Sequence, residues 1–371
     1  MRMLLCLFLF LCTSTFIEGQ SVERDTMKLN YISPIPWQPN TYVCQQPIDE
    51  IVIDGLDHEM SWKSTKWSDD FVDIEGISKS SPRHKTKVKM LWDKDYFYIL
   101  TVLEEPHIWA TLTKRDTVVY LDHAFEVFID PDGDAHNYYE FQVNALNTIW
   151  DLFMLWPYRE KRGPNYLTQW DAAGIKHAVH IEGSLNDATD TDSQWSVEMA
   201  IPWTAIQEMA PRRMAPRDSD QWRMNFARVD WQMEVVEGVY KKRLQYNGQP
   251  KPERYATWSP HGIPAMHMPE WWGYVQFSDS SVDEGIPAFK VKTSEEVKWA
   301  LWQLYYQQKD VYEKMGVYAT AIEQFTIPIS KKCVFEPTLF ASNFGFQFSA
   351  PSCDGKTVWL INETGKIWRA K

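Results

Sequence analysis

The stretch that decides the fold runs from residue 124 to residue 145 and reads AFEVFIDPDGDAHNYYEFQVNA. Apolar and polar side chains alternate on both sides of a turn at 131–134, which predicts an antiparallel hairpin with one face in a core. The expected core face holds Phe125, Val127, Ile129, Tyr139, Phe141 and Val143. The opposite face then carries Glu126, Phe128, Tyr138, Glu140, Gln142 and Asn144. Such a row of carboxylates and amides is either a solvent-facing surface or a platform that hydrogen-bonds hydroxyl groups.

Segments with the same alternation lie on both sides of this hairpin, between about residue 51 and residue 279. A second hairpin is expected at 88–102, and the remaining elements are predicted strands at 148–154, 176–182, 194–201, 221–231 and 272–278 and a short helix at 202–209. Long helical periods are missing from this region. The pattern predicts a mainly β protein built on an antiparallel β-sandwich.

The alternation of apolar and polar residues ends at about residue 279. We expect a linker at 280–292, followed by a small α+β tail at 293–371. A capping box at 293–296 opens one amphipathic helix of about 20 residues. Short strands are expected at 345–349, 357–361 and 367–369. Cys333 and Cys353 lie close together in this tail, so a disulfide between them is predicted if the compartment is oxidising.

The first residues read MRMLLCLFLFLC, one basic residue followed by an apolar run too short to span a bilayer. This is typical of a secretory signal peptide, and cleavage is expected after Gly19. Residues 20–50 would form an N-terminal arm. The mature chain is therefore expected to be secreted, without insertion into a membrane.

The composition restricts the partners of the protein. The 371 residues carry a formal net charge of -12, which disfavours nucleic acid. The chain also contains 19 Trp, 17 Tyr and 18 Phe, more flat aromatic surface than a core of this size requires. Aromatic rings pack well in cores but also stack against sugar rings. The composition alone does not decide between these two roles of the rings, and we expect a monomer.

Six segments occur in the order and spacing of carbohydrate-binding module family 9, which the region 51–279 resembles. They are Ile53-Asp54-Gly55, Leu91-Trp92-Asp93, Phe125-Glu126-Val127-Phe128-Ile129-Asp130-Pro131, Phe141-Gln142-Val143-Asn144, Trp195-Ser196-Val197-Glu198-Met199-Ala200-Ile201-Pro202-Trp203 and Trp272-Gly273-Tyr274-Val275-Gln276-Phe277.

The resemblance implies a sandwich that holds the end of a glycan between two aromatic side chains. Tyr120 and Trp258 stand in those two places, and Glu126 is the strand glutamate that hydrogen-bonds sugar hydroxyls. Gln142 stands where the family pattern has an arginine. Asn144, two residues further along the strand, is also expected to bind the sugar. The ligand would be a polysaccharide or oligosaccharide, and the role would be polysaccharide recognition or catabolism, with no catalytic residue.

No cofactor is required by this interpretation, but a structural calcium ion is one possibility. Asp130, Asp132 and Asp134 supply oxygen ligands at alternate positions around a glycine, as calcium-binding loops do. An ordinary acidic turn is the alternative explanation of the same residues.

Two other functions remain open at the level of sequence. Glu126 and Glu140 on paired strands could supply the two carboxylates of a glycoside hydrolase. Met266-His267-Met268 could instead hold a haem, because sandwich folds related to this one bind haem through Met and His.

Overall fold

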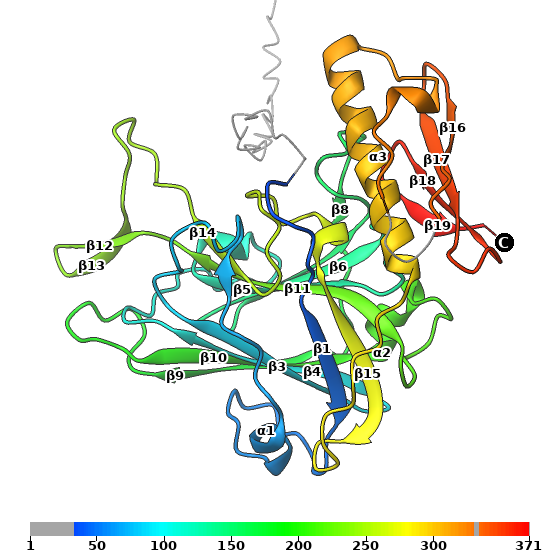
Figure 1. Ribbon diagram of the computed structural model, residues 1–371. Coiled ribbons are helices and arrows are strands. Elements are labelled where there is room, and N and C mark those ends of the chain that lie inside the picture. Colours follow the sequence, from blue (N-terminus) through cyan, green and yellow to red (C-terminus); the bar gives the residue numbers. More distant parts are fainter. Residues whose placement is uncertain (1–32, 330–333, 371) are drawn as a thin grey trace, which may run out of the picture. The chain divides into compact units, whose positions relative to one another are not determined.

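The computed structural model describes residues 33–329 and 334–370, and these residues form one compact, mainly β unit (Figure 1). The predicted signal peptide at 1–19 lies outside the described residues, as does the greater part of the predicted arm. Within the described residues, no helix has the length and apolar character needed to cross a bilayer.

The first sheet has the strand order β8-β7-β6-β5-β11-β15-β1, and β14 also pairs with β11 and with β2. Its strands are β1 (Thr41–Gln46), β2 (Val72–Asp73), β5 (Ala124–Asp130), β6 (Tyr138–Asn144), β7 (Ile149–Met154), β8 (Tyr166–Leu167), β11 (Gln221–Asp230), β14 (Arg254–Thr257) and β15 (Gly273–Ser281). The predicted hairpin is β5 and β6, whose residues pair in an unbroken antiparallel register from Ala124 opposite Asn144 to Ile129 opposite Tyr139.

The second sheet packs against the first and continues the order as β1-β3-β4-β10-β9. Its strands are β3 (Thr86–Trp92), β4 (Tyr96–Glu104), β9 (Lys176–Glu182) and β10 (Gln194–Pro202). The short helices of this region are α1 (Met60–Ser64), α2 (Trp203–Ile206), η1 (Val119–Leu121), η2 (Gln207–Met209) and η3 (Pro269–Trp271). A separate hairpin joins β12 (Met233–Val236) to β13 (Val239–Lys242). The prediction of a mainly β, antiparallel sandwich is confirmed.

β1 belongs to both sheets. Residues 41–44 pair in parallel with residues 274–277 of β15, and after a bulge Gln45 lies opposite Leu91 of β3. The expected arm at 20–50 thus contributes a central strand. Sequence alternation did not indicate this strand because its partners are distant in the chain and no hairpin turn adjoins it.

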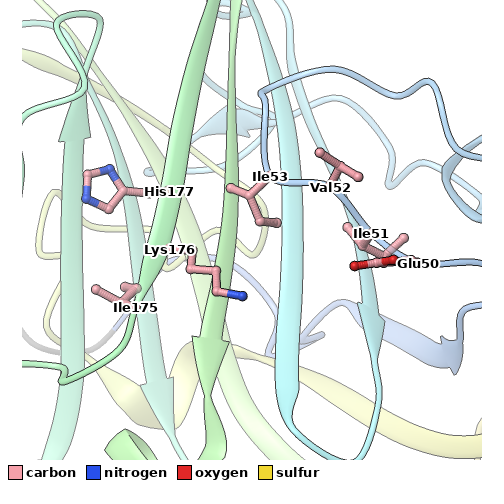
Figure 2. Close-up of a pocket in the computed structure, with 7 residues that line it drawn as sticks. All are labelled: Glu50, Ile51, Val52, Ile53, Ile175, Lys176 and His177. Carbon is pink, nitrogen blue, oxygen red and sulfur yellow. The ribbon is translucent and has the colours of Figure 1, made fainter.

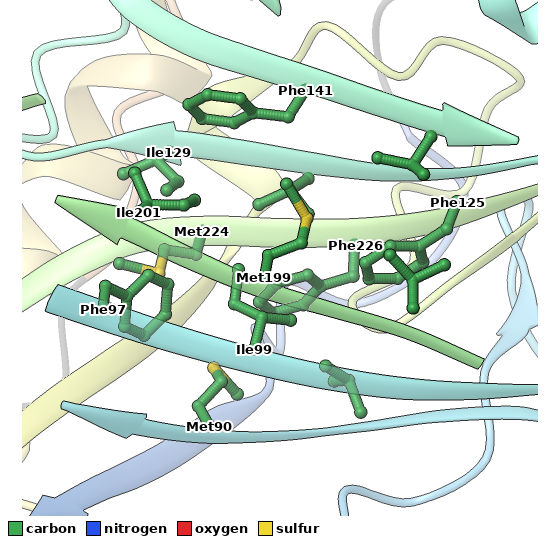
Figure 3. Packing of buried hydrophobic residues seen from close by; sticks show 14 of the residues in the cluster. Met90, Phe97, Ile99, Phe125, Ile129, Phe141, Met199, Ile201, Met224 and Phe226 are labelled. Carbon is green, nitrogen blue, oxygen red and sulfur yellow. The ribbon is translucent and has the colours of Figure 1, made fainter. Parts of the chain in front are cut away.

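The core lies between the two sheets (Figure 3). The alternating side chains predicted for the core face of β5 and β6 all belong to this cluster, together with inward-facing residues of β3, β4, β10 and β11. Phe125 and Phe226 stack across neighbouring strands with ring centroids 6.1 Å apart. Burial of such large apolar side chains supplies the main driving force for closing the sandwich.

The C-terminal segment contains α3 (Ser294–Met315), η4 (Ile322–Gln324) and a four-stranded antiparallel sheet. That sheet is formed by β16 (Thr338–Ala341), β17 (Phe346–Pro351), β18 (Val358–Asn362) and β19 (Ile367–Arg369). α3 ends at Gly316, whose φ of 71° is the left-handed conformation that glycine adopts easily. The predicted capping box at 293–296 does not form, because Thr293 makes no side-chain capping bond. The predicted disulfide includes Cys333, which lies outside the described residues, so this pairing stays a prediction.

We expect Phe226→Ala to lower the free energy of unfolding by about 3–5 kcal/mol, because it leaves a large cavity in the core. Phe226 is fully buried, whereas Phe340 on the C-terminal sheet is 72% exposed and serves as the matched control. Phe340→Ala should change the free energy of unfolding by less than about 0.5 kcal/mol. Urea unfolding followed by tryptophan fluorescence measures both, and equal losses would contradict this placement of the core.

Candidate functional site

The polar side of the β5–β6 hairpin extends onto the neighbouring strand. Glu126 of β5 lies directly opposite Gln142 of β6, and Gln142 lies directly opposite Trp150 of β7. Glu140 is one pair further along the same face, opposite Phe128. We call these four residues, Glu126, Glu140, Gln142 and Trp150, the polar face. All four are nearly fully buried, so their polar atoms are held in fixed places.

Gln142 connects the polar face to the segment that precedes β5. Its side-chain Oε1 accepts a hydrogen bond from the Tyr120 backbone N–H at 2.9 Å. Its Nε2 donates to Glu140 Oε1 at 2.6 Å. With both ends engaged, the Gln142 amide orients the Glu140 carboxyl group and fixes the position of η1.

Two buried polar atoms of this face have no hydrogen-bond partner among the described residues: Glu140 Oε2 and Trp150 Nε1. Their side chains are 3% and 5% exposed. Burial raises the pKa of Glu140 to about 7, although the hydrogen bond from Gln142 opposes this shift. Leaving such groups without partners is costly. The face therefore holds one buried acceptor and one buried donor whose hydrogen bonds the described residues do not supply.

Aromatic rings border the polar face. Tyr158 is 45% exposed, and its ring packs edge-to-face against His267 with centroids 4.4 Å apart. Tyr166 packs against both Tyr158 and Trp150, at 6.1 and 6.2 Å. His267 Nε2 lies 3.7 Å from Glu140 Oε2 and connects this border to the polar face.

His267 was expected from the sequence only as a possible haem ligand, between Met266 and Met268. In the structure its Nδ1 shares a hydrogen bond of 2.8 Å with the hydroxyl of Tyr138, on the outer face of β6. Both methionines are buried, and Met266 belongs to the apolar cluster on that outer face.

The predicted aromatic clamp of Tyr120 and Trp258 is wrong. Trp258 is only 3% exposed and belongs to the core between the sheets, where it packs against Phe226 with ring centroids 5.7 Å apart. Tyr120 packs on the opposite, outer side of the first sheet. Trp258 continues the alternation of β14, so it shares the inward direction of Ala256. Reading that alternation across the end of the strand would have placed Trp258 in the core.

Asn144 is also not available to a ligand. Its Oδ1 accepts hydrogen bonds from the backbone N–H groups of Leu146 and Thr148, each at 3.0 Å. Its Nδ2 donates to Leu112 O at 2.8 Å and to Asp122 Oδ2 at 3.0 Å. The side chain therefore organises the turn between β6 and β7. Of the predicted sugar-binding residues, Tyr120, Glu126 and Gln142 are brought together on one side of the sheet.

The three aspartates of the β5–β6 turn do come together. Asp130, Asp132 and Asp134 offer carboxylate oxygens that all lie within 4.8 Å of one another. Burial first, and then the Asp134 carboxylate, raise the pKa of Asp132 to about 6. Lys366 Nζ lies 3.0 Å from Asp134 Oδ2 and offsets part of the negative charge. The donor set of clustered carboxylates fits a hard cation such as calcium.

A hollow of about 480 Å³ lies elsewhere on the molecule, between residues 50–53 and the start of β9 (Figure 2). Ile51, Val52, Ile53 and Ile175 line part of it, and the rest of its wall is polar, with Glu50, Lys176 and His177. β9 is the edge strand of the second sheet, whereas the polar face belongs to the first. The hollow contains none of the unpartnered polar groups described above, so we do not assign the ligand to it.

The C-terminal helix holds the two loops that carry Tyr158 and His267. Arg159, next to Tyr158, donates to Glu270 Oε1 at 2.6 Å, and Tyr306 of α3 also donates to Glu270. The following residue, Glu160, accepts a hydrogen bond from Tyr305 at 2.9 Å and lies 3.1 Å from Lys309 Nζ. These groups are buried, so α3 fixes the border of the polar face.

We expect Tyr306→Phe to lower the free energy of unfolding by about 1–2 kcal/mol, because Glu270 loses a buried hydrogen-bond donor. Tyr312→Phe, near the exposed end of α3, is the matched control and should have almost no effect. Hydrogen exchange of residues 155–165 should become faster in Tyr306→Phe only. Unchanged exchange in that loop would show that α3 does not hold it.

Comparison with known proteins shows what the first part of the sandwich is similar to. Residues 53–216 match the family model described as carbohydrate family 9 binding domain-like. The chain is 29% identical over 142 residues to endo-1,4-beta-xylanase A of Thermotoga maritima, and 27% identical over 118 residues to exoglucanase XynX of Acetivibrio thermocellus. These segments cover 36% and 32% of this chain but only 12% and 9% of the two enzymes. The chain thus spans a small part of the curated relatives that it matches.

Two solved structures align with about two thirds of the chain. A family 9 carbohydrate binding module from Caldicellulosiruptor kristjanssonii in complex with cellotriose aligns with a TM-score of 0.41 and 12% identity, covering 67% of this chain and 99% of that one. A putative carbohydrate-binding protein from Bacteroides uniformis aligns with a TM-score of 0.46 and 14% identity, covering 65% and 100%. The similarity to carbohydrate family 9 binding domains therefore rests on the family model, which matches residues 53–216.

Proposed function

We propose that this chain, whose residues 53–216 form a domain like carbohydrate family 9 binding domains, binds a glycan at the polar face. The observation that carries the proposal is a pair of buried atoms on one face of one sheet, Glu140 Oε2 and Trp150 Nε1, to which the described residues supply no hydrogen bond. Sugar hydroxyls both donate and accept hydrogen bonds, so a single sugar can satisfy both atoms.

The surroundings of the polar face suit a sugar in two further ways. Hydrogen bonds to carboxylates such as Glu126 and Glu140 are stronger than bonds between neutral groups. The half-exposed ring of Tyr158 offers a flat apolar surface to the C–H groups of a sugar ring. A few charge-assisted bonds and one or two stacking contacts suffice for affinities of about 1 μM.

The wider setting is also part of the proposal. The apolar N-terminal stretch supports secretion after cleavage of a signal peptide. The curated relatives that match about a third of this chain are named as an endo-1,4-beta-xylanase and an exoglucanase. We therefore infer a monomeric, secreted protein that recognises glycans during polysaccharide breakdown. The predicted disulfide between Cys333 and Cys353 would stabilise its C-terminal segment.

We expect soluble cellotriose to bind the mature chain, and Trp150→Phe to weaken binding at least about tenfold, because the indole N–H donor is lost. Trp67→Phe, which alters a tryptophan packed with the second sheet, is the matched control and should bind like the wild type. Isothermal titration calorimetry measures both variants, with thermal unfolding as a check of folding. Equal affinities for the two folded variants would contradict this location of the site.

We also propose that the turn formed by Asp130, Asp132 and Asp134 binds calcium. The folded-state pKa of Asp132, about 6, lies above its usual 3.8. The folded chain therefore binds protons more tightly than the unfolded chain, and without metal this group's contribution to stability is lost as the pH rises from about 4 to 6. A bound cation would remove that penalty by neutralising the carboxylates.

Calcium in excess at pH 7 should therefore raise the melting temperature, and a concentration one hundred times the dissociation constant stabilises the fold by about 2.7 kcal/mol. Asp132→Asn should be more stable than the wild type in calcium-free buffer and should respond less to calcium. Asp187→Asn, at an exposed loop, is the control. If calcium leaves the melting temperature of the wild type unchanged, the turn is an ordinary acidic turn that does not bind calcium.

Hydrolysis is a second candidate function, favoured by one observation. A carboxyl group with a pKa of about 7, such as Glu140, can serve as a general acid. Glu126 lies diagonally across β5 and β6 from it, on the same face. Release of reducing sugar by the wild type but not by Glu126→Gln would establish this activity, whereas binding without release leaves the protein a binding module.

A further inference from the structure

A lysine of the C-terminal sheet reaches the aspartate turn between β5 and β6. Lys366 lies in the turn between β18 and β19, and its Nζ lies 3.0 Å from Asp134 Oδ2. The backbone N–H of the next residue, Ile367, donates to the Asp134 carbonyl oxygen at 3.1 Å. The side chains of Lys366 and Asp134 are 37% and 12% exposed. The C-terminal segment therefore places an ammonium group on the residues proposed to bind calcium.

Backbone N–H groups of the aspartate turn itself hold two of its three carboxylates. The Asp130 carboxylate accepts hydrogen bonds from the N–H groups of Gly133 and Ala135, at 3.0 and 2.9 Å. Asp134 Oδ1 accepts a hydrogen bond from the His136 N–H at 2.7 Å. These bonds lie within the turn, so replacing the lysine should leave the carboxylates in place.

The turn that carries the lysine is also held by its own hydrogen bonds. Asn362 Oδ1 accepts from the backbone N–H groups of Thr364 and Lys366, at 3.1 and 3.0 Å. The Asn362 N–H donates to the Lys366 carbonyl oxygen at 3.1 Å. A lysine ammonium group sits on a flexible four-carbon stem. The ammonium group can therefore leave Asp134 while the backbone of the β18–β19 turn stays folded.

The ammonium group and a calcium ion compete for the same carboxylate. Each of the three aspartates offers one oxygen, and these oxygens lie within 4.8 Å of one another. Calcium in proteins takes about six to eight oxygen ligands, so an ion at this turn needs the Asp134 carboxylate. Two cations on one carboxylate repel each other. Asp132 is exposed, so an ion can reach the turn from solvent.

A second lysine lies near the aspartate turn but is paired with its own helix. A Cβ atom on Gly133 would lie 3.9 Å from Lys298 Nζ, so this ammonium group is close to the turn. It lies 3.0 Å from Glu295 Oε1 and 4.5 Å from the centre of the Trp359 ring. Lys298 therefore supplies a matched control for a positive charge beside the turn.

We propose that the Lys366 ammonium group occupies the cation position of the aspartate turn when calcium is absent and leaves it when calcium binds. This inference rests on the proposed calcium site and specifies how that site is regulated. The lysine lowers the affinity for calcium, because the ion must displace it from Asp134. Calcium in turn breaks one contact between the C-terminal segment and the sandwich, since the coupling is reciprocal.

Lys366→Met tests the competition, because it removes the ammonium group and keeps an unbranched side chain. It should bind calcium at least about tenfold more tightly than the wild type, which is a usual size for coupling between two binding events. Lys298→Met removes the same charge beside the turn and should change the affinity much less. Lys356→Met, at an exposed position of the same sheet, should leave it unchanged. Calorimetry with calcium chloride measures all four proteins, and thermal unfolding checks that each is folded.

A chemical readout separates release of the lysine from a general effect of charge. Acetylation by an N-hydroxysuccinimide ester, followed by mass spectrometry of peptides, measures the accessibility of each lysine. In the wild type, calcium should speed the acetylation of Lys366 severalfold. The labelling rate of Lys356 should not change.

Each outcome decides between the two proposals. If the wild type and Lys366→Met bind calcium equally, or if calcium leaves the labelling of Lys366 unchanged, the competition is overturned and the calcium site stands. If Lys298→Met gains as much affinity as Lys366→Met, the effect is one of general charge, which also overturns the inference. If neither the wild type nor Lys366→Met binds calcium, the proposed calcium site itself is wrong, and the inference fails with it.

Discussion

The alternation of side chains along β5 and β6 is the constraint on which the rest of the structure depends. A strand directs successive side chains to opposite faces, so the residues that fill the core also determine which residues face outward. Phe125 and Val127 cannot enter the core without placing Glu126 on the outer face. The packing of the sandwich and the chemistry of its candidate site are therefore two results of one register.

The outer face becomes a site only because other segments surround it. Tyr158 and His267 come from loops that are held in place by buried bonds to α3, through Arg159 and Glu270. The C-terminal segment, which the sequence suggests is a separate appendage, therefore acts as structural support for the border of the polar face. Removing it would leave two buried carboxylates, Glu160 and Glu270, without some of their partners.

Much of this arrangement could be predicted from the sequence, and the failures have a common physical cause. The β5–β6 hairpin, α3 and the polar row with Glu126 and Gln142 follow from local periodicity. Trp258 was misassigned because its role was carried over from the family pattern, whereas its spacing from the inward-facing Ala256 could have placed it in the core.

The roles of Trp150 and Tyr158 could not have been found in the sequence, since they depend on strand pairing and on the position of a long loop. β1 was missed for a similar reason. Its partners lie in β15 and β3, and neither adjoins it in the chain.

The parallel pairing of β1 with β15 also affects how the protein can be made. The first strand of the described chain finds its principal partner more than two hundred residues later, so the first sheet is incomplete until residues 274–277 have been synthesised. Until then the edges of β15's neighbours and the apolar side of the sandwich stay open to water and to other chains. Folding on the ribosome must therefore finish late, and chaperones that cover these unpaired edges would protect the chain until its synthesis is complete.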